Sequence, residues 1–111
     1  MDKEIFSLQA KKVQDLQMME QTLQNILVQK QTFQLELNEV LSALDELKDS
    51  NEEVFKIVGQ IMIKSKKEKL KEDLKAKKDF LELRIKNLDK QEKSFREKLY
   101  SQREEIMKEL K

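Results

Sequence analysis

The side chains that could do chemistry in this sequence are almost all carboxylates and basic groups. The 111 residues include 22 Asp or Glu and 23 Lys or Arg, whereas histidine and cysteine are absent. Without those two residue types, most metal-binding clusters and every His-based or Cys-based catalytic arrangement are impossible. The single glycine, Gly59, also excludes a glycine-rich phosphate loop. We therefore expect a binding protein, not an enzyme, with no catalytic residue, cofactor or metal.

The charged residues, 41% of the chain, lie in long stretches with a seven-residue apolar repeat, which is typical of a coiled coil. A disordered chain could share this charge content, but it would lack the regular apolar spacing. In the first half, nine of ten positions in two heptad series are apolar, and Lys30 is the exception. We expect Lys30 to extend its charge outward to solvent; the alternative is a role in setting the helix register. The two series are Leu16, Leu23, Lys30, Leu37 and Leu44, and Met19, Ile26, Phe33, Val40 and Leu47.

The second half repeats this pattern less regularly, because polar residues interrupt its apolar seam. Its two series are Leu74, Leu81, Leu88, Phe95 and Gln102, and Lys78, Ile85, Glu92, Leu99 and Ile106. We expect one helix over residues 1–50 and a second over residues 67–111.

A short β-type run over residues 53–65 separates the two halves. It is rich in Val and Ile, whose branched side chains pack well in a pleated sheet. Gly59 fits a tight turn because glycine readily adopts positive φ. The sequence thus predicts a mainly α fold in a single domain over residues 1–111, with two long helices forming an antiparallel coiled-coil hairpin joined by a short β-hairpin.

The distribution of charge favours the antiparallel arrangement. Residues 14–53 contain nine acidic and two basic residues, whereas residues 64–78 contain eight lysines and three acidic residues. Folding back places the basic start of the second helix beside the acidic end of the first. The lysine block could instead bind nucleic acid, but it lacks interleaved aromatics, so we expect no nucleic-acid partner.

The β-hairpin is apolar on both faces, which predicts that both faces become covered. An isolated two-stranded ribbon is marginally stable in water and its edges can pair with further strands. We expect it to join hairpins of other chains in a closed or nearly closed sheet; the alternative is packing against its own helices. The expected assembly residues are Val54, Phe55, Ile57, Val58, Gly59, Ile61, Met62 and Ile63.

Both chain ends meet at one tip of the predicted hairpin, where several apolar residues lie off the seam. Exposed apolar patches commonly mark interaction sites, and Met adapts to varied partners. Ordinary seam packing is the alternative, and it accounts in part for Leu99 and Ile106. The expected binding residues are Ile5, Phe6, Leu8, Val13, Leu99, Tyr100, Ile106, Met107 and Leu110.

Three stretches resemble the beta-type subunits of the prefoldin family. They are QNILVQKQ at residues 24–31, VFKIVG at residues 54–59 and LELRIKNLDKQE at residues 81–92. Heptad stretches alone are weakly specific, because any coiled coil can mimic them. The bend motif between two such arms is more specific, and the single short hairpin resembles the beta-type rather than the alpha-type subunit.

The resemblance implies a co-chaperone subunit within a hexamer of two alpha-type and four beta-type chains. In such a hexamer the hairpins form an intersubunit β-barrel, and the coiled-coil tips bind non-native proteins without ATP. The resemblance also implies delivery of these clients to a group II chaperonin in the cytoplasm. The alternative function is a structural coiled-coil adaptor or tether with one defined protein partner. We expect no membrane partner, because no run approaches the roughly 18 apolar residues that span a bilayer.

Overall fold

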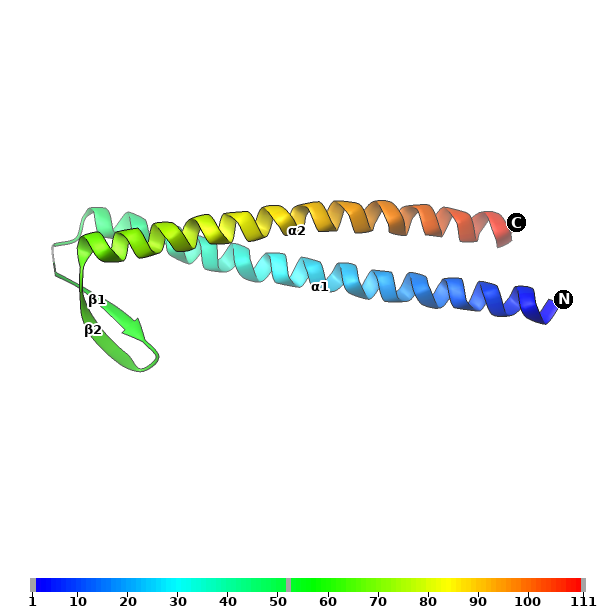
Figure 1. Ribbon diagram of the computed structural model, residues 1–111, viewed down its shortest axis with the longest axis horizontal. Coiled ribbons are helices and arrows are strands. Elements are labelled where there is room, and N and C mark those ends of the chain that lie inside the picture. Colours follow the sequence, from blue (N-terminus) through cyan, green and yellow to red (C-terminus); the bar gives the residue numbers. More distant parts are fainter. Residues whose placement is uncertain (1, 52, 111) are drawn as a thin grey trace. The chain divides into compact units, whose positions relative to one another are not determined.

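The computed structural model describes residues 2–51 and 53–110, apart from the side chain of Leu110. Helix α1 spans Asp2–Lys48 and helix α2 spans Lys67–Leu110. Between them, strands β1 (Glu53–Val58) and β2 (Ile61–Lys66) form an antiparallel sheet (Figure 1). The prediction of two long helices joined by a β-hairpin is therefore confirmed. The helix limits expected at residues 1 and 111 lie outside the described residues.

Helix α1 ends where its last carbonyls find other donors. The backbone amides of Asp49 and Ser50 donate to the carbonyls of Glu46 and Leu47, at 3.3 and 3.4 Å. The Ser50 hydroxyl also donates to the Leu47 carbonyl at 3.0 Å. Lys67, the first residue of α2, donates from its Nζ to the Ser50 carbonyl at 3.0 Å. The bonds to Glu46 and Leu47 satisfy carbonyls that the helix leaves without intrahelical partners, and the bond from Lys67 ties the residue after the helix to the start of α2.

The hairpin turns over two residues, Gly59 and Gln60, because Val58 pairs directly with Ile61. Gly59 has a φ of 62°, and no described non-glycine residue has a positive φ. A positive φ at the first central position only is the pattern of a type II′ turn, which matches the twist of paired strands. The glycine is therefore required by the backbone, as the sequence predicted.

The chain divides into two compact units, each with its own buried residues. The hairpin unit comprises residues 32–86, and its core is Leu37, Val40 and Leu81, the last only 1% exposed. Leu23, Ile26, Leu88 and Leu99 are buried in the terminal unit, which comprises residues 1–31 and 87–111. All seven belong to the predicted heptad series, so each unit is held together by the coiled-coil seam.

Two of the polar seam residues, Lys30 and Glu92, pair with each other in the terminal unit. The Nζ of Lys30 lies 2.6 Å from a carboxylate oxygen of Asp89 and 3.2 Å from one of Glu92. Arg96 also contacts Glu92, at 3.1 Å. The charge of Lys30 is thus directed across to α2, not simply outward to solvent as the sequence predicted. Two interruptions of the seam compensate each other in this way.

Candidate binding surfaces

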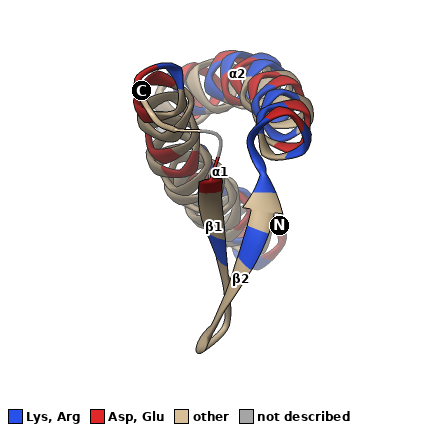
Figure 2. Ribbon diagram, turned by 90° about the vertical axis from the view of Figure 1, so that its left-hand side faces the viewer, with Lys and Arg blue, Asp and Glu red and all other residues tan. Residues whose placement is uncertain are grey.

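The first candidate site is an apolar surface on the β-hairpin, here called the hairpin surface. It consists of Phe55, Ile57, Val58, Ile61, Met62 and Ile63, which are between 48% and 69% exposed. The hairpin branches from the ends of the two helices of its unit (Figure 1), and its turn end carries no charged residue (Figure 2). Such a concentration of exposed apolar side chains in a small element is typical of an interaction site.

The strand register divides the hairpin into two faces. Cross-strand partners lie on the same face, so Val58, Ile61 and Ile63 share one face while Phe55, Ile57 and Met62 share the other. Neither group is covered by the helices of the same chain, and of the predicted assembly residues only Val54 is buried, at 8% exposure. Packing against its own helices therefore accounts for Val54 alone. The six other apolar residues remain available to another chain.

The second candidate site lies near the two ends of the chain, within the terminal unit. Here α1 and α2 lie side by side and antiparallel (Figure 1), and charged side chains connect them. Lys12 pairs with Glu109 and, at 3.6 Å, with Glu105. Arg103 pairs with Glu20 at 2.7 Å. These contacts hold together the segments of α1 and α2 that carry the predicted apolar residues.

Six predicted residues are exposed there, and they are here called the terminal surface. They are Ile5, Phe6, Leu8, Val13, Tyr100 and Met107, between 41% and 72% exposed. Leu99 is buried at 7% and Ile106 is half-buried, so the seam holds both of them beneath the surface. The predicted residue Leu110 has no described side chain.

Two shallow hollows shape the terminal surface. One, of about 260 Å³, is lined by Ile5 and Leu8 of α1 together with Glu109 of α2. The other, of about 430 Å³, is lined by Tyr100 and Met107 of α2 with neighbouring charged residues. Apolar side chains with charges at their margin suit reversible contact with a partly apolar chain.

The ion pairs of the terminal unit favour the charged forms of the side chains that make them. The pKa of Lys12 is raised, chiefly by its hydrogen bond to Glu109. The pKa of Lys30 is raised by its hydrogen bonds to Asp89 and Glu92, and that of Glu92 is lowered by its bond from Lys30. These shifts stabilise existing ion pairs, and they do not prepare a group for proton transfer.

Among the described residues, neither a metal-binding cluster nor a membrane-spanning helix is found. No group of three or more His, Cys, Asp or Glu residues there could hold a metal ion. Within the same residues, no helix combines the length and the apolar character that crossing a membrane requires.

A solved structure shares this arrangement of helices and hairpin, and a family model and sequence relatives match most of this chain. Residues 9–111 match the family described as prefoldin subunit. Prefoldin subunit beta of Pyrobaculum aerophilum is 39% identical over 90 residues, which cover 79% of this chain and 71% of the relative. Prefoldin subunit beta of Thermococcus kodakarensis is 42% identical over 86 residues, covering 76% and 74%. The crystal structure of the prefoldin beta subunit from Thermococcus strain KS-1 matches with a TM-score of 0.83 at 36% identity, covering 94% of this chain and 93% of that one.

Proposed function

This chain belongs to the prefoldin subunit family as a beta-type member, and we propose that it binds non-native proteins through its terminal surface within a hexamer. The hexamer contains two alpha-type and four beta-type subunits, and it delivers its clients to a group II chaperonin in the cytoplasm. No step requires ATP or catalysis. The observation that carries the proposal is the exposure of six apolar side chains on the terminal surface.

The hairpin surface supports the assembly part of this proposal. Its six apolar residues are exposed on both faces of a two-stranded sheet, and the sheet has two unpaired edges. Hairpins of neighbouring subunits would cover these faces and continue the hydrogen bonding at the edges. Burial of apolar area and strand pairing then favour the same arrangement, a closed intersubunit barrel.

The terminal surface suits clients because unfolded chains expose apolar side chains in no fixed order. Phe6 and Met107 are 72% and 59% exposed, and they provide one rigid and one flexible apolar contact. Each contact is weak alone. Several coiled coils on one hexamer would bind the same client at once, so the contacts add through effective concentration. Release to a chaperonin remains easy because no single contact dominates.

A triple substitution of the terminal surface tests this proposal. Replacing Ile5, Phe6 and Met107 with serine removes three exposed apolar side chains without touching the buried seam. We expect suppression of client aggregation, measured by light scattering of a denatured protein on dilution, to require several times more hexamer. The hexamer itself should form normally.

A matched control removes similar apolar area elsewhere. Leu35, Phe80 and Leu83 are 61%, 58% and 57% exposed and belong to the hairpin unit. Their replacement with serine should leave suppression unchanged. Full suppression by an intact hexamer carrying the terminal triple substitution would overturn the proposal.

A further inference from the structure

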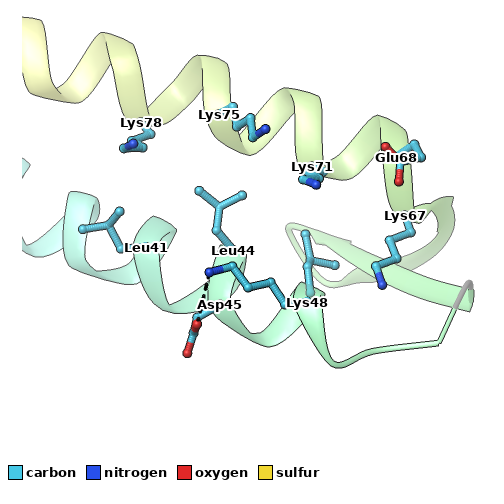
Figure 3. Close-up of a pocket in the computed structure, with 10 residues that line it drawn as sticks. Leu41, Leu44, Asp45, Lys48, Lys67, Glu68, Lys71, Lys75 and Lys78 are labelled. Atoms are coloured by element: carbon cyan, nitrogen blue, oxygen red, sulfur yellow. Dashed lines mark ion pairs between the residues drawn. The ribbon is translucent and has the colours of Figure 1, made fainter.

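A groove runs between the end of α1 and the start of α2 in the hairpin unit (Figure 3). It encloses about 490 Å³ and combines three leucines of α1 with lysines from both helices. The leucines are Leu41, Leu44 and Leu47. The lysines are Lys48, Lys67, Lys71, Lys75 and Lys78. Neither the hairpin surface nor the terminal surface includes any of these residues.

The groove exists because lysines stand where the coiled-coil seam of α2 calls for apolar residues. Counted back by heptad steps, the series of Leu81 and Leu74 reaches position 67, and the series of Ile85 reaches positions 78 and 71. All three positions are lysines. Lysine side chains leave the seam by directing their charge outward. Two of the leucines opposite are incompletely covered, since Leu41 is 42% exposed and Leu44 is half-buried, whereas Leu47 is buried at 7%.

The positive charge of the groove is poorly compensated. Its lining includes five lysines but only two carboxylates, those of Asp45 and Glu68. Lys48 lies 3.8 Å from Asp45, a long and exposed pair. Lys71 and Lys75 form no ion pair with any described residue. An anionic ligand would therefore meet at least two unpaired ammonium groups.

From these contacts we infer that the groove binds an acidic amphipathic segment of another polypeptide. The leucines of the groove suit leucine-like side chains of that segment, and the lysines suit its carboxylates. Nucleic acid fits less well, because the lining contains neither aromatic residues for base stacking nor arginine. The inference goes beyond the proposed function because it concerns a different surface. The groove would select its ligand by negative charge as well as by apolar character.

A synthetic peptide of about 14 residues, with Leu and Glu at helical spacing, is the probe for this site. Binding is measured by fluorescence anisotropy to the full-length chain, assembled with its alpha-type partner where the two assemble. Replacing Lys71 and Lys75 with glutamate should weaken binding about tenfold or more, because two charge-assisted contacts become repulsive. Circular dichroism verifies that the variant remains helical.

The matched control changes the same stretch outside the groove. Lys69 and Lys77 are exposed and do not line it. The double variant K69E/K77E alters the net charge by the same amount as K71E/K75E. Because its two positions lie outside the groove, it should change binding of the peptide by no more than about twofold. Equal loss in both double variants would show a general electrostatic attraction and overturn the proposed groove.

A charge swap keeps the test independent of folding defects. A peptide with Lys in place of every Glu should bind the K71E/K75E variant more tightly than it binds the unaltered chain. Failure of the acidic peptide to bind the unaltered chain would overturn the inference. Displacement of the bound acidic peptide by a single-stranded oligonucleotide of the same net charge would also overturn the inference. Suppression of client aggregation should stay unchanged in K71E/K75E. The proposal for the groove and the proposal for the terminal surface can therefore be refuted independently.

Discussion

Replacing Val58 and Ile61 with aspartate should abolish assembly while leaving both helices folded. The two residues are directly opposite each other in the strand register, next to the turn. They are 49% and 65% exposed in this chain, so neither contributes much to the fold of the chain itself. Any large effect of these substitutions must therefore arise from contacts with other subunits.

The exposed fractions set the size of the effect. Full burial of a Val or Ile side chain contributes about 1.5–3 kcal/mol, so completing the burial of these two contributes about 2–3 kcal/mol in all. Losing that alone raises the dissociation constant about 30-fold to 150-fold. Two carboxylates buried without partners add several kcal/mol more, and the total loss exceeds about a thousandfold.

Size-exclusion chromatography with light scattering measures this outcome on the chain mixed with an alpha-type prefoldin subunit. The control variant N51D/Q60D adds the same two negative charges at exposed positions outside the hairpin surface. It should assemble normally. Circular dichroism should show unchanged helix content in both variants. A normal hexamer containing V58D/I61D would refute the argument that the hairpins form a shared sheet.

Three further changes probe the fold that supports these surfaces. Leu81 is 1% exposed, and its replacement with alanine should lower the free energy of unfolding, measured by urea titration, by about 2–5 kcal/mol. The same change at Leu83, which is 57% exposed, should lower it by less than about 0.5 kcal/mol. Equal losses would contradict the assigned core. Gly59→Ala should weaken assembly about tenfold, because positive φ costs an alanine about 1–2 kcal/mol; unchanged assembly would exclude the assigned turn. The hydrogen bond from Lys30 lowers the pKa of Glu92, so this carboxylate stabilises the fold above its ordinary pKa of 4.5, and the stabilisation is lost as the pH falls through the lowered value. Glu92→Gln should therefore be less stable than the unaltered chain near pH 7, by about 1 kcal/mol, and the difference in unfolding free energy should vanish in strong acid; a difference independent of pH would contradict the pairing.

The order of helix, hairpin and helix could be predicted because the two halves and the bend follow different patterns. Seven-residue apolar repeats mark the helices, and a β-branched run with one glycine marks the bend. The same heptads assigned Leu99 to the seam and left Tyr100 and Met107 off it, as their exposure shows, although Leu99 was also expected to be a binding residue. Side-chain exposure along a helix follows directly from its period, so this part needed no structure.

The pairing of Lys30 with Glu92 could not be predicted in the same way. Each residue interrupts its own seam, and the heptad pattern of one helix does not show which residue of the other helix lies opposite. That information depends on the register between the helices, which the structure supplies through the Lys30 contacts with Asp89 and Glu92. The pattern of one helix alone therefore predicts that the Lys30 side chain extends to solvent.

The lysine groove was missed for a related reason. The block over residues 64–78 is evident as charge, but its leucine floor belongs to the other helix. Only the packing of α1 against α2 within the hairpin unit brings Leu44 opposite Lys71 and Lys75 (Figure 3). The role of the hairpin surface stays a prediction for a different reason, because the chains that would cover it are separate molecules.

The native mass of this chain, alone and after mixing with an alpha-type prefoldin subunit, tests the central claim most directly. Native mass spectrometry counts the copies of each chain without any assumption about shape. We expect a heterohexamer with four copies of this chain and two of the alpha-type subunit. A stable dimer of this chain that ignores the alpha-type subunit would contradict the account, and the role of a coiled-coil adaptor with a private partner would then explain the hairpin better.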